Sequence, residues 1–183
     1  GLKGSDSENI WSYINSVSEL SSFSRTSDML DRIDSNIFEK FTLITSSGYL
    51  GEYVINDKNI DYDIVYTPEI NQTTKNDTVN LLHQFIEHNV DLILYAGGDG
   101  TSVVVQSVIK DTIPVIAIPV GVKMYSGIFP LSPIHSANIF NEYINSSNRE
   151  YILREISDLD DTLITEGETG TKFSGYLKTP LIL

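Results

Sequence analysis

The segment Gly97–Thr101, with the sequence Gly-Gly-Asp-Gly-Thr, has the composition of a phosphate-binding loop that also carries an acid. We call it the GGDGT loop. The apolar run Leu92–Ala96 before it predicts a buried strand, and Ser102–Ile109 after it predicts a helix. Ligands of α/β proteins bind in the crevice at the carboxyl end of such a strand. A carboxylate there would repel phosphates, so Asp99 is expected to hold a metal ion or accept a proton. The alternative is an Asp that fixes a turn or caps the next helix.

The other loop residues have equally simple candidate roles. Gly97, Gly98 and Gly100 allow a sharp turn and leave no Cβ between their backbone N–H groups and a phosphate. The alternative is a tight turn that binds no ligand. Thr101 is expected to cap the following helix, and its hydroxyl could also reach a phosphate oxygen.

A second candidate segment follows the next predicted strand, Pro114–Ile118. Gly121 and Lys123 lie just after this strand, so we expect them near the GGDGT loop in a parallel sheet. Lys123 could neutralise a phosphate. The alternative is a solvated lysine at a helix start.

Four segments together resemble one family. Residues 97–101 resemble the signature of the NAD kinase and diacylglycerol/sphingosine kinase superfamily. The block 118–126, Ile-Pro-Val-Gly-Val-Lys-Met-Tyr-Ser, is similar to the archaeal and bacterial ATP-NAD kinase-like branch. The opening residues 1–6 and the late segment 176–180 are also similar to this branch. The resemblance therefore covers segments from nearly the whole chain.

This resemblance implies phosphorylation of the adenosine-ribose 2′-hydroxyl of NAD to give NADP, with ATP or polyphosphate as donor and a divalent metal, Mg²⁺, as cofactor. It implies that Asp99 acts on that hydroxyl and on the metal ion. It also implies that Lys3 and Asp6 border the phosphate channel, although both could equally belong to a disordered end. Members of the family are commonly homo-oligomers, so we expect one here.

Two other functions stay open. One is a kinase of the same superfamily that acts on a lipid or small-polyol hydroxyl. Residues 121–124 do not show the Gly-Thr-Gly-Asn of the lipid-kinase branch, which lowers this possibility. The other is a non-catalytic nucleotide-binding relative, similar to the acetoin-catabolism-associated members, that keeps the glycines without turnover.

Composition limits the partners. The 183 residues carry a net charge of −13, which argues against a nucleic-acid or anionic-membrane surface. No apolar run reaches the ~18 residues of a spanning helix, and no cysteine is present, so we expect a cytoplasmic protein. The residues His83, His88 and His135 show no metal-binding spacing and are expected at the surface.

The order of elements predicts an α/β fold, with a doubly wound parallel sheet flanked by helices over residues 1–148. Residues 149–183 read as the start of a β-rich second domain. Compared with the family, we expect the first domain to lack its first strand and the second to be truncated. The expected helices are Ser7–Val17, Thr26–Ile37 (capped by Thr26 or Ser27), Tyr49–Ile55, one starting at Thr74 with Asp77 in a capping box, Ser102–Ile109 and Pro133–Ser146. The expected strands are Phe41–Thr45, Asp63–Tyr66, Leu92–Ala96, Pro114–Ile118, Tyr151–Ile156 and Phe173–Leu183.

Overall fold

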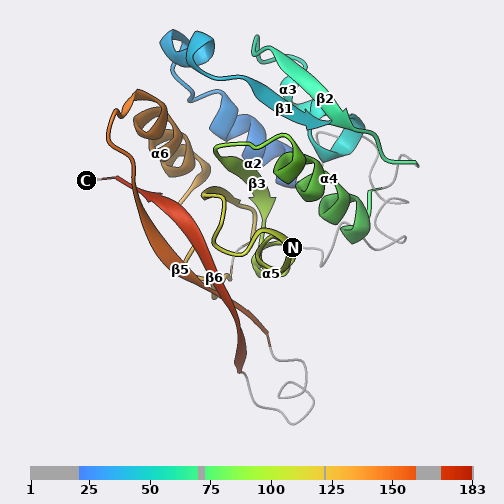
Figure 1. Ribbon diagram of the computed structural model, residues 1–183, viewed down its shortest axis with the longest axis vertical. Helices are drawn as coiled ribbons and strands as arrows, with labels where there is room; N and C mark the ends of the chain where they lie inside the picture. The colour runs from blue at the N-terminus through green and yellow to red at the C-terminus, as the bar shows by residue number, and fades with distance from the viewer. Residues whose placement is uncertain (1–20, 70–72, 122, 160–169, 183) are drawn as a thin grey trace.

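A computed structural model describes residues 21–69, 73–121, 123–159 and 170–182 (Figure 1). The expected helix Ser7–Val17 lies outside these residues. The described elements, in chain order, are α2 (Ser21–Leu30), η2 (Ser35–Lys40), β1 (Leu43–Ser46), η3 (Gly48–Leu50), α3 (Glu52–Ile55), β2 (Tyr62–Tyr66), α4 (Lys75–Glu87), β3 (Ile93–Gly97), α5 (Asp99–Ile109), β4 (Val115–Pro119), α6 (Pro133–Asn145), β5 (Glu150–Leu159) and β6 (Thr171–Leu181).

The strands pair two by two. β1 pairs with β2 and β3 pairs with β4, both in parallel, while β5 and β6 form an antiparallel hairpin. The mixed α/β character is therefore as expected. Within the described residues, however, the two parallel pairs are not hydrogen-bonded to each other, so one continuous doubly wound sheet is not seen there.

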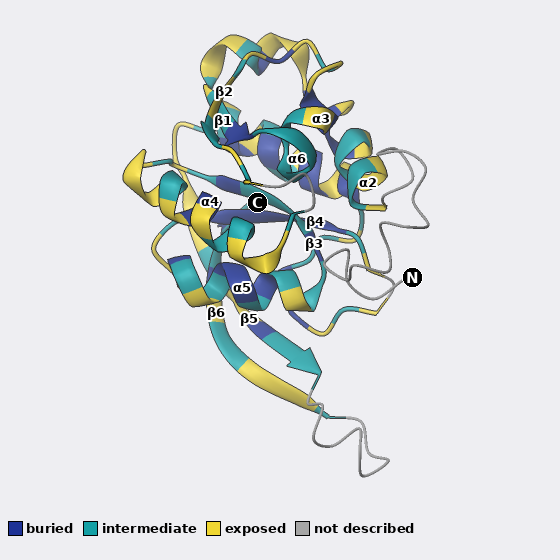
Figure 2. Ribbon diagram, turned by 90° about the vertical axis from the view of Figure 1, so that its right-hand side faces the viewer, coloured by how far each residue is buried: buried dark blue, intermediate teal, exposed yellow. Residues whose placement is uncertain are grey.

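The β3–β4 pair lies at the centre of the core. All five residues of β4 are buried, as in a parallel strand that is covered on both faces. Ile116 and Ile118 pack into a cluster with α2 and α6, while Val115 and Ala117 pack into a cluster with α5 and the hairpin. Figure 2 shows this layering, with α5 and the hairpin on one side of β3–β4 and α2 and α6 on the other.

The expected helix Thr26–Ile37 is wrong in its bounds. Helix α2 already includes Ser21 and ends at Leu30, and Thr26 lies inside it, where its hydroxyl donates to the Ser22 carbonyl at 2.7 Å. Local turn bonds follow the last residue of α2, from the Arg32 N–H to the Met29 carbonyl and from the Ile33 N–H to the Leu30 carbonyl. The Asn141 side chain of α6 accepts from the Asp34 N–H at 3.1 Å and donates to the Arg32 carbonyl at 3.0 Å, which stabilises the turn between α2 and η2.

The expected capping box at the start of α4 is confirmed. The Asp77 carboxylate accepts from the Thr74 N–H at 2.8 Å, and the Thr74 hydroxyl oxygen accepts from the Asp77 N–H at 3.4 Å. The Tyr66 hydroxyl also donates to Asp77 at 2.7 Å. Burial alone would raise the pKa of Asp77, but hydrogen bonds from Tyr66 and Thr74 outweigh burial and hold the pKa below its ordinary value.

The β5–β6 hairpin packs across α5, and its far end extends away from the molecule (Figure 1). Ile156 and Leu177 are fully buried in the cluster that also contains Val105 of α5. Gly175 has a φ of +136°, and a Cβ at this position would lie 2.3 Å from the Gln106 side-chain nitrogen. The hairpin is thus closely packed on α5, and the expected domain division at residue 148 stays a prediction.

None of the helices in the described ranges is both long and apolar enough to cross a membrane.

Candidate functional site

The GGDGT loop is a short connection between β3 and α5. Strand β3 ends at Gly97, Gly98 is the N-cap residue, and α5 begins at Asp99. The expected start at Ser102 was therefore three residues too late. The Ser102 N–H donates to the Gly98 carbonyl at 3.0 Å, which is the first bond of the helix. Thr101 consequently lies in the first turn and does not cap the helix.

Only one of the three loop glycines, Gly97, is required by the space around it. None of Gly97, Gly98 and Gly100 is among the described glycines with positive φ, so the short turn from β3 into α5 does not depend on a left-handed backbone conformation. A Cβ at Gly97 would lie 2.5 Å from the Thr101 Cβ, so this glycine lets α5 approach β3. At Gly98 and Gly100, in contrast, a Cβ would meet nothing within 4 Å. The space beside these two residues is open, as close approach of a ligand to the backbone requires.

The Asp99 carboxylate joins the GGDGT loop to the segment after β4. One oxygen accepts from the Tyr125 N–H at 2.7 Å and the other accepts from the Ser126 N–H at 2.8 Å. In addition, the Val120 N–H donates to the Gly97 carbonyl at 3.1 Å. The expected proximity of the two segments is thus confirmed. Each carboxylate oxygen still has lone-pair capacity for one more donor or a cation.

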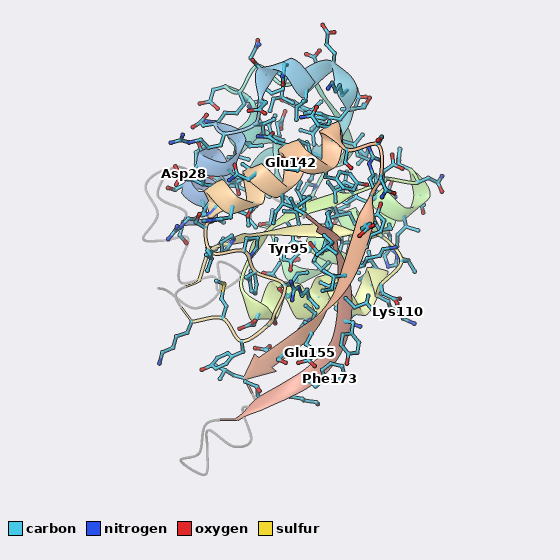
Figure 3. All side chains as sticks on the ribbon, turned by 90° about the vertical axis from the view of Figure 1, so that its left-hand side faces the viewer. Asp28, Tyr95, Lys110, Glu142, Glu155 and Phe173 are labelled. Carbon is cyan, nitrogen blue, oxygen red and sulfur yellow. The ribbon has the colours of Figure 1, made fainter. Side chains whose placement is uncertain are left out.

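Tyr95 of β3 supports the GGDGT loop through a hydrogen bond to Ser102 of α5. Its hydroxyl lies 2.8 Å from the Ser102 hydroxyl, which in turn donates to the Gly98 carbonyl at 3.1 Å, and Figure 3 shows Tyr95 inside the molecule. Burial raises the pKa of the Tyr95 hydroxyl, the hydrogen bond to Ser102 opposes this effect, and the charge of Asp99 adds to it. Tyr95 therefore stays protonated and acts as a structural support. Sequence reasoning missed it, although a tyrosine inside a buried apolar run was a signal.

An open cavity of about 1970 Å³ extends along the whole of β3, and the GGDGT loop lines one end of it. All the expected site residues within the described ranges line it, namely Gly97, Gly98, Asp99, Gly100, Thr101, Gly121 and Lys123. Lys123 is exposed to solvent. The lining also includes Lys75 at the start of α4 and a second carboxylate, Asp158 of β5, which sequence reasoning did not single out.

The charge of this lining differs from that of the whole chain. Among the described residues, five Lys or Arg and four Asp or Glu line the cavity, whereas the sequence holds 12 and 25. These charges do not all lie at the loop, because Arg149 contacts Tyr143, whose hydroxyl donates to the Asp91 carbonyl before the start of β3, whereas the loop follows the end of β3.

Some expected residues do not join the site. Lys3 and Asp6 lie outside the described residues. The three histidines are exposed, as expected. Over the described ranges no three or more His, Cys, Asp or Glu side chains form a group that could hold a metal ion by themselves. A metal ion at Asp99 would therefore need further ligands of another kind, such as water or phosphate oxygens.

Comparison with known proteins identifies the family. The sequence model of the ATP-NAD kinase N-terminal domain matches residues 28–148. The chain belongs to the ATP-NAD kinase family, as the resemblance of its motifs implied. This is a family of kinases whose small-molecule ligands are NAD and ATP. The search of curated proteins and the search of solved structures find no match.

Proposed function

We propose that this protein transfers a phosphoryl group from ATP or polyphosphate to the adenosine-ribose 2′-hydroxyl of NAD and so produces NADP. One observation carries the proposal. Within the family-matched region, Asp99 lies at the start of α5 between two glycines whose surroundings are open, at the carboxyl end of the parallel pair β3–β4. This combination offers backbone N–H groups to phosphates and one carboxylate to a hydroxyl.

The proposed chemistry follows from these groups. The first N–H groups of α5 have no carbonyl partner within the helix and favour an anion through the helix dipole. The 2′-hydroxyl oxygen attacks the terminal phosphorus of the donor, the bond to the bridging oxygen breaks, and ADP or a shortened polyphosphate leaves. Asp99 orients the hydroxyl and accepts its proton through a lone pair that Tyr125 and Ser126 leave free.

The metal requirement is part of the proposal. Magnesium is commonly held by one or two carboxylates together with substrate phosphates, and Asp99 and Asp158 both line the cavity. The ion would neutralise charge that develops on the phosphates. Lys75 and Lys123 are the cations of the lining that lie at the start of α4 and after β4, where they could offset the remaining charge.

A non-catalytic nucleotide-binding relative is the second candidate, and one observation favours it. Both carboxylate oxygens of Asp99 accept hydrogen bonds from backbone N–H groups that lie 26 and 27 residues away in sequence. An Asp with a purely structural role would make such contacts. In that case the loop would still bind a nucleotide, but no phosphoryl group would be transferred.

The deciding experiment offers the purified protein a panel of acceptors with Mg-ATP or polyphosphate. NAD, a diacylglycerol and a small polyol are compared by the product formed. The variant Asp99→Asn tests the site, and Asp77→Asn is its matched control, because Asp77 also accepts a backbone N–H at a helix start but does not line the cavity. The proposal expects transfer to NAD that Asp99→Asn abolishes and Asp77→Asn keeps. Binding of NAD or ATP without transfer to any acceptor would instead support the second candidate.

Assembly into homo-oligomers and a cytoplasmic location both stay predictions. So does the arrangement of the two parallel strand pairs within one doubly wound fold.

A further inference from the structure

Ser126 has contacts on two sides. Its backbone N–H donates to Asp99, while its hydroxyl donates to the Ser157 carbonyl at 2.9 Å and accepts from the Ser157 N–H at 3.0 Å. The residue is 6 % exposed, so these bonds replace water. Removing the hydroxyl would leave the Ser157 backbone groups without these partners, which is costly for groups withdrawn from water.

The contact with β5 lies where the strand is irregular. The register between β5 and β6 shifts between Ile156 and Ser157, which is the position that Ser126 contacts. The Gly127 N–H also donates to the Glu155 carbonyl at 2.9 Å. Figure 3 labels Glu155 on the hairpin. The segment Ser126–Gly127 is therefore attached to β5 across this irregularity.

These contacts close a ring of elements. Helix α5 carries Asp99 at its start and Val105 and Ile109 further along, and these two residues share a buried cluster with Ile156 of β5. From β5 the ring returns through Ser126 to the Asp99 carboxylate. Within the described residues, the Ser126 hydroxyl is the hydrogen-bonding side-chain link between the segment after β4 and the hairpin, and Ile128 of the same segment shares the buried cluster with Ile156.

We propose that Ser126 is a positioning residue that fixes the Asp99 carboxylate by holding its two N–H donors against β5, so that the β5–β6 hairpin sets the geometry of the site. The kinetic part of this inference rests on the proposed function. Misplacing a reacting group by about 1 Å can lower a rate by about 10²-fold. We therefore expect Ser126→Ala to lower kcat by about 10- to 100-fold, with little change in KM for NAD.

The test combines kinetics with amide hydrogen exchange on the full chain. Ser136→Ala is the matched control, since Ser136 is fully buried and its hydroxyl donates to the Ala117 carbonyl at 2.8 Å, away from Asp99. Ser126→Ala should speed amide exchange at Tyr125 and Ser157, and Ser136→Ala should not. In an Asp99→Asn background, Ser126→Ala should lower the residual rate no further, because it acts through Asp99.

Three results would overturn the inference. The first is a kcat of Ser126→Ala within about twofold of that of Ser136→Ala. The second is that Ser126→Ala lowers the rate by the same factor in the Asp99→Asn background as in the wild type. The third result does not require a folded Ser126→Ala variant. It is that Asp99→Asn speeds amide exchange at Tyr125 but leaves exchange of the Ser157 amide unchanged. The contact at Asp99 would then be uncoupled from the contact at Ser157. If the wild type transfers no phosphate but the exchange pattern holds, the proposed function fails and the coupling stands.

Discussion

Gly97 and Gly100 should respond in opposite ways to the same substitution by Ala. Gly100 lies in the first turn of α5, its φ is not positive, and an added Cβ would meet nothing within 4 Å. Ala in a helix is more favourable than Gly by about 0.5–1 kcal/mol. At Gly97 the added Cβ would lie 2.4 Å from the Thr101 hydroxyl oxygen and 2.5 Å from the Thr101 Cβ. Backbone must move to relieve such a contact, at a cost of about 1–3 kcal/mol.

These energies convert to shifts in melting temperature. For a chain of this size, 1 kcal/mol changes Tm by about 2–4 °C. Gly100→Ala should therefore raise Tm by about 1–4 °C, and Gly97→Ala should lower it by about 2–12 °C.

Although Gly100→Ala should raise the melting temperature, it should weaken ligand binding. Its Cβ would fill the open space through which a phosphate approaches the backbone, and losing a hydrogen bond to a charged group costs about 1.5–3 kcal/mol. The affinity for ATP or NADP should fall roughly 10- to 100-fold. Calorimetric titration gives the nucleotide affinity of each variant, and thermal unfolding gives the melting temperature of each. A Gly100→Ala protein that is more stable and binds as tightly as wild type would refute the reasoning that ligands approach this backbone.

The remaining predictions concern three other features. Asp99→Asn should lower NADP formation by about 10²- to 10⁴-fold while nucleotide affinity stays within about threefold by titration, since the glycines remain; retention of half the wild-type rate would make Asp99 structural. Thr74→Ala should cost about 0.5–2 kcal/mol in urea unfolding, because it removes the cap of α4, and an unchanged midpoint would contradict the capping box. The pKa of Asp77 is lower in the folded protein, so its stabilisation is present above the ordinary pKa of 3.8 and is lost as pH falls below it. The difference in unfolding free energy between wild type and Asp77→Asn should therefore narrow from pH 7 towards pH 3, and a constant difference would argue against a titrating cap. Because the chain carries −13, ATP should bind more tightly in MgCl₂ than in EDTA and KCl of equal ionic strength; equal affinities would remove the metal role of Asp99.

The elements around the loop could be predicted because their signals are local. Apolar runs identified β3 and β4, and the Thr74–Asp77 box identified the start of α4. The bounds of α2 could not be predicted, because the turn after it contacts Asn141, which lies more than 100 residues away in sequence. The sequence also suggested that the strands form one sheet, whereas their pairing depends on contacts that no local pattern encodes.

The site was predictable in its residues and not in its contacts. The motif pointed to Asp99 and its glycines, and the adjacent strand explained why Gly121 and Lys123 line the same cavity. The two N–H donors to Asp99 are backbone groups, which carry no residue-type signal. The contact role of Ser126 could not be predicted either, because its partners at Ser157 are also backbone atoms.

The central claim is that Asp99 in the GGDGT loop serves phosphoryl transfer to NAD. The most direct measurement is the rate of NADP formation by the purified protein with Mg-ATP or polyphosphate, for wild type and Asp99→Asn at saturating NAD. We predict NADP formation by the wild type and a rate lower by at least about 10²-fold in Asp99→Asn. No NADP from a wild type that binds NAD, or equal rates in the two proteins, would contradict the claim.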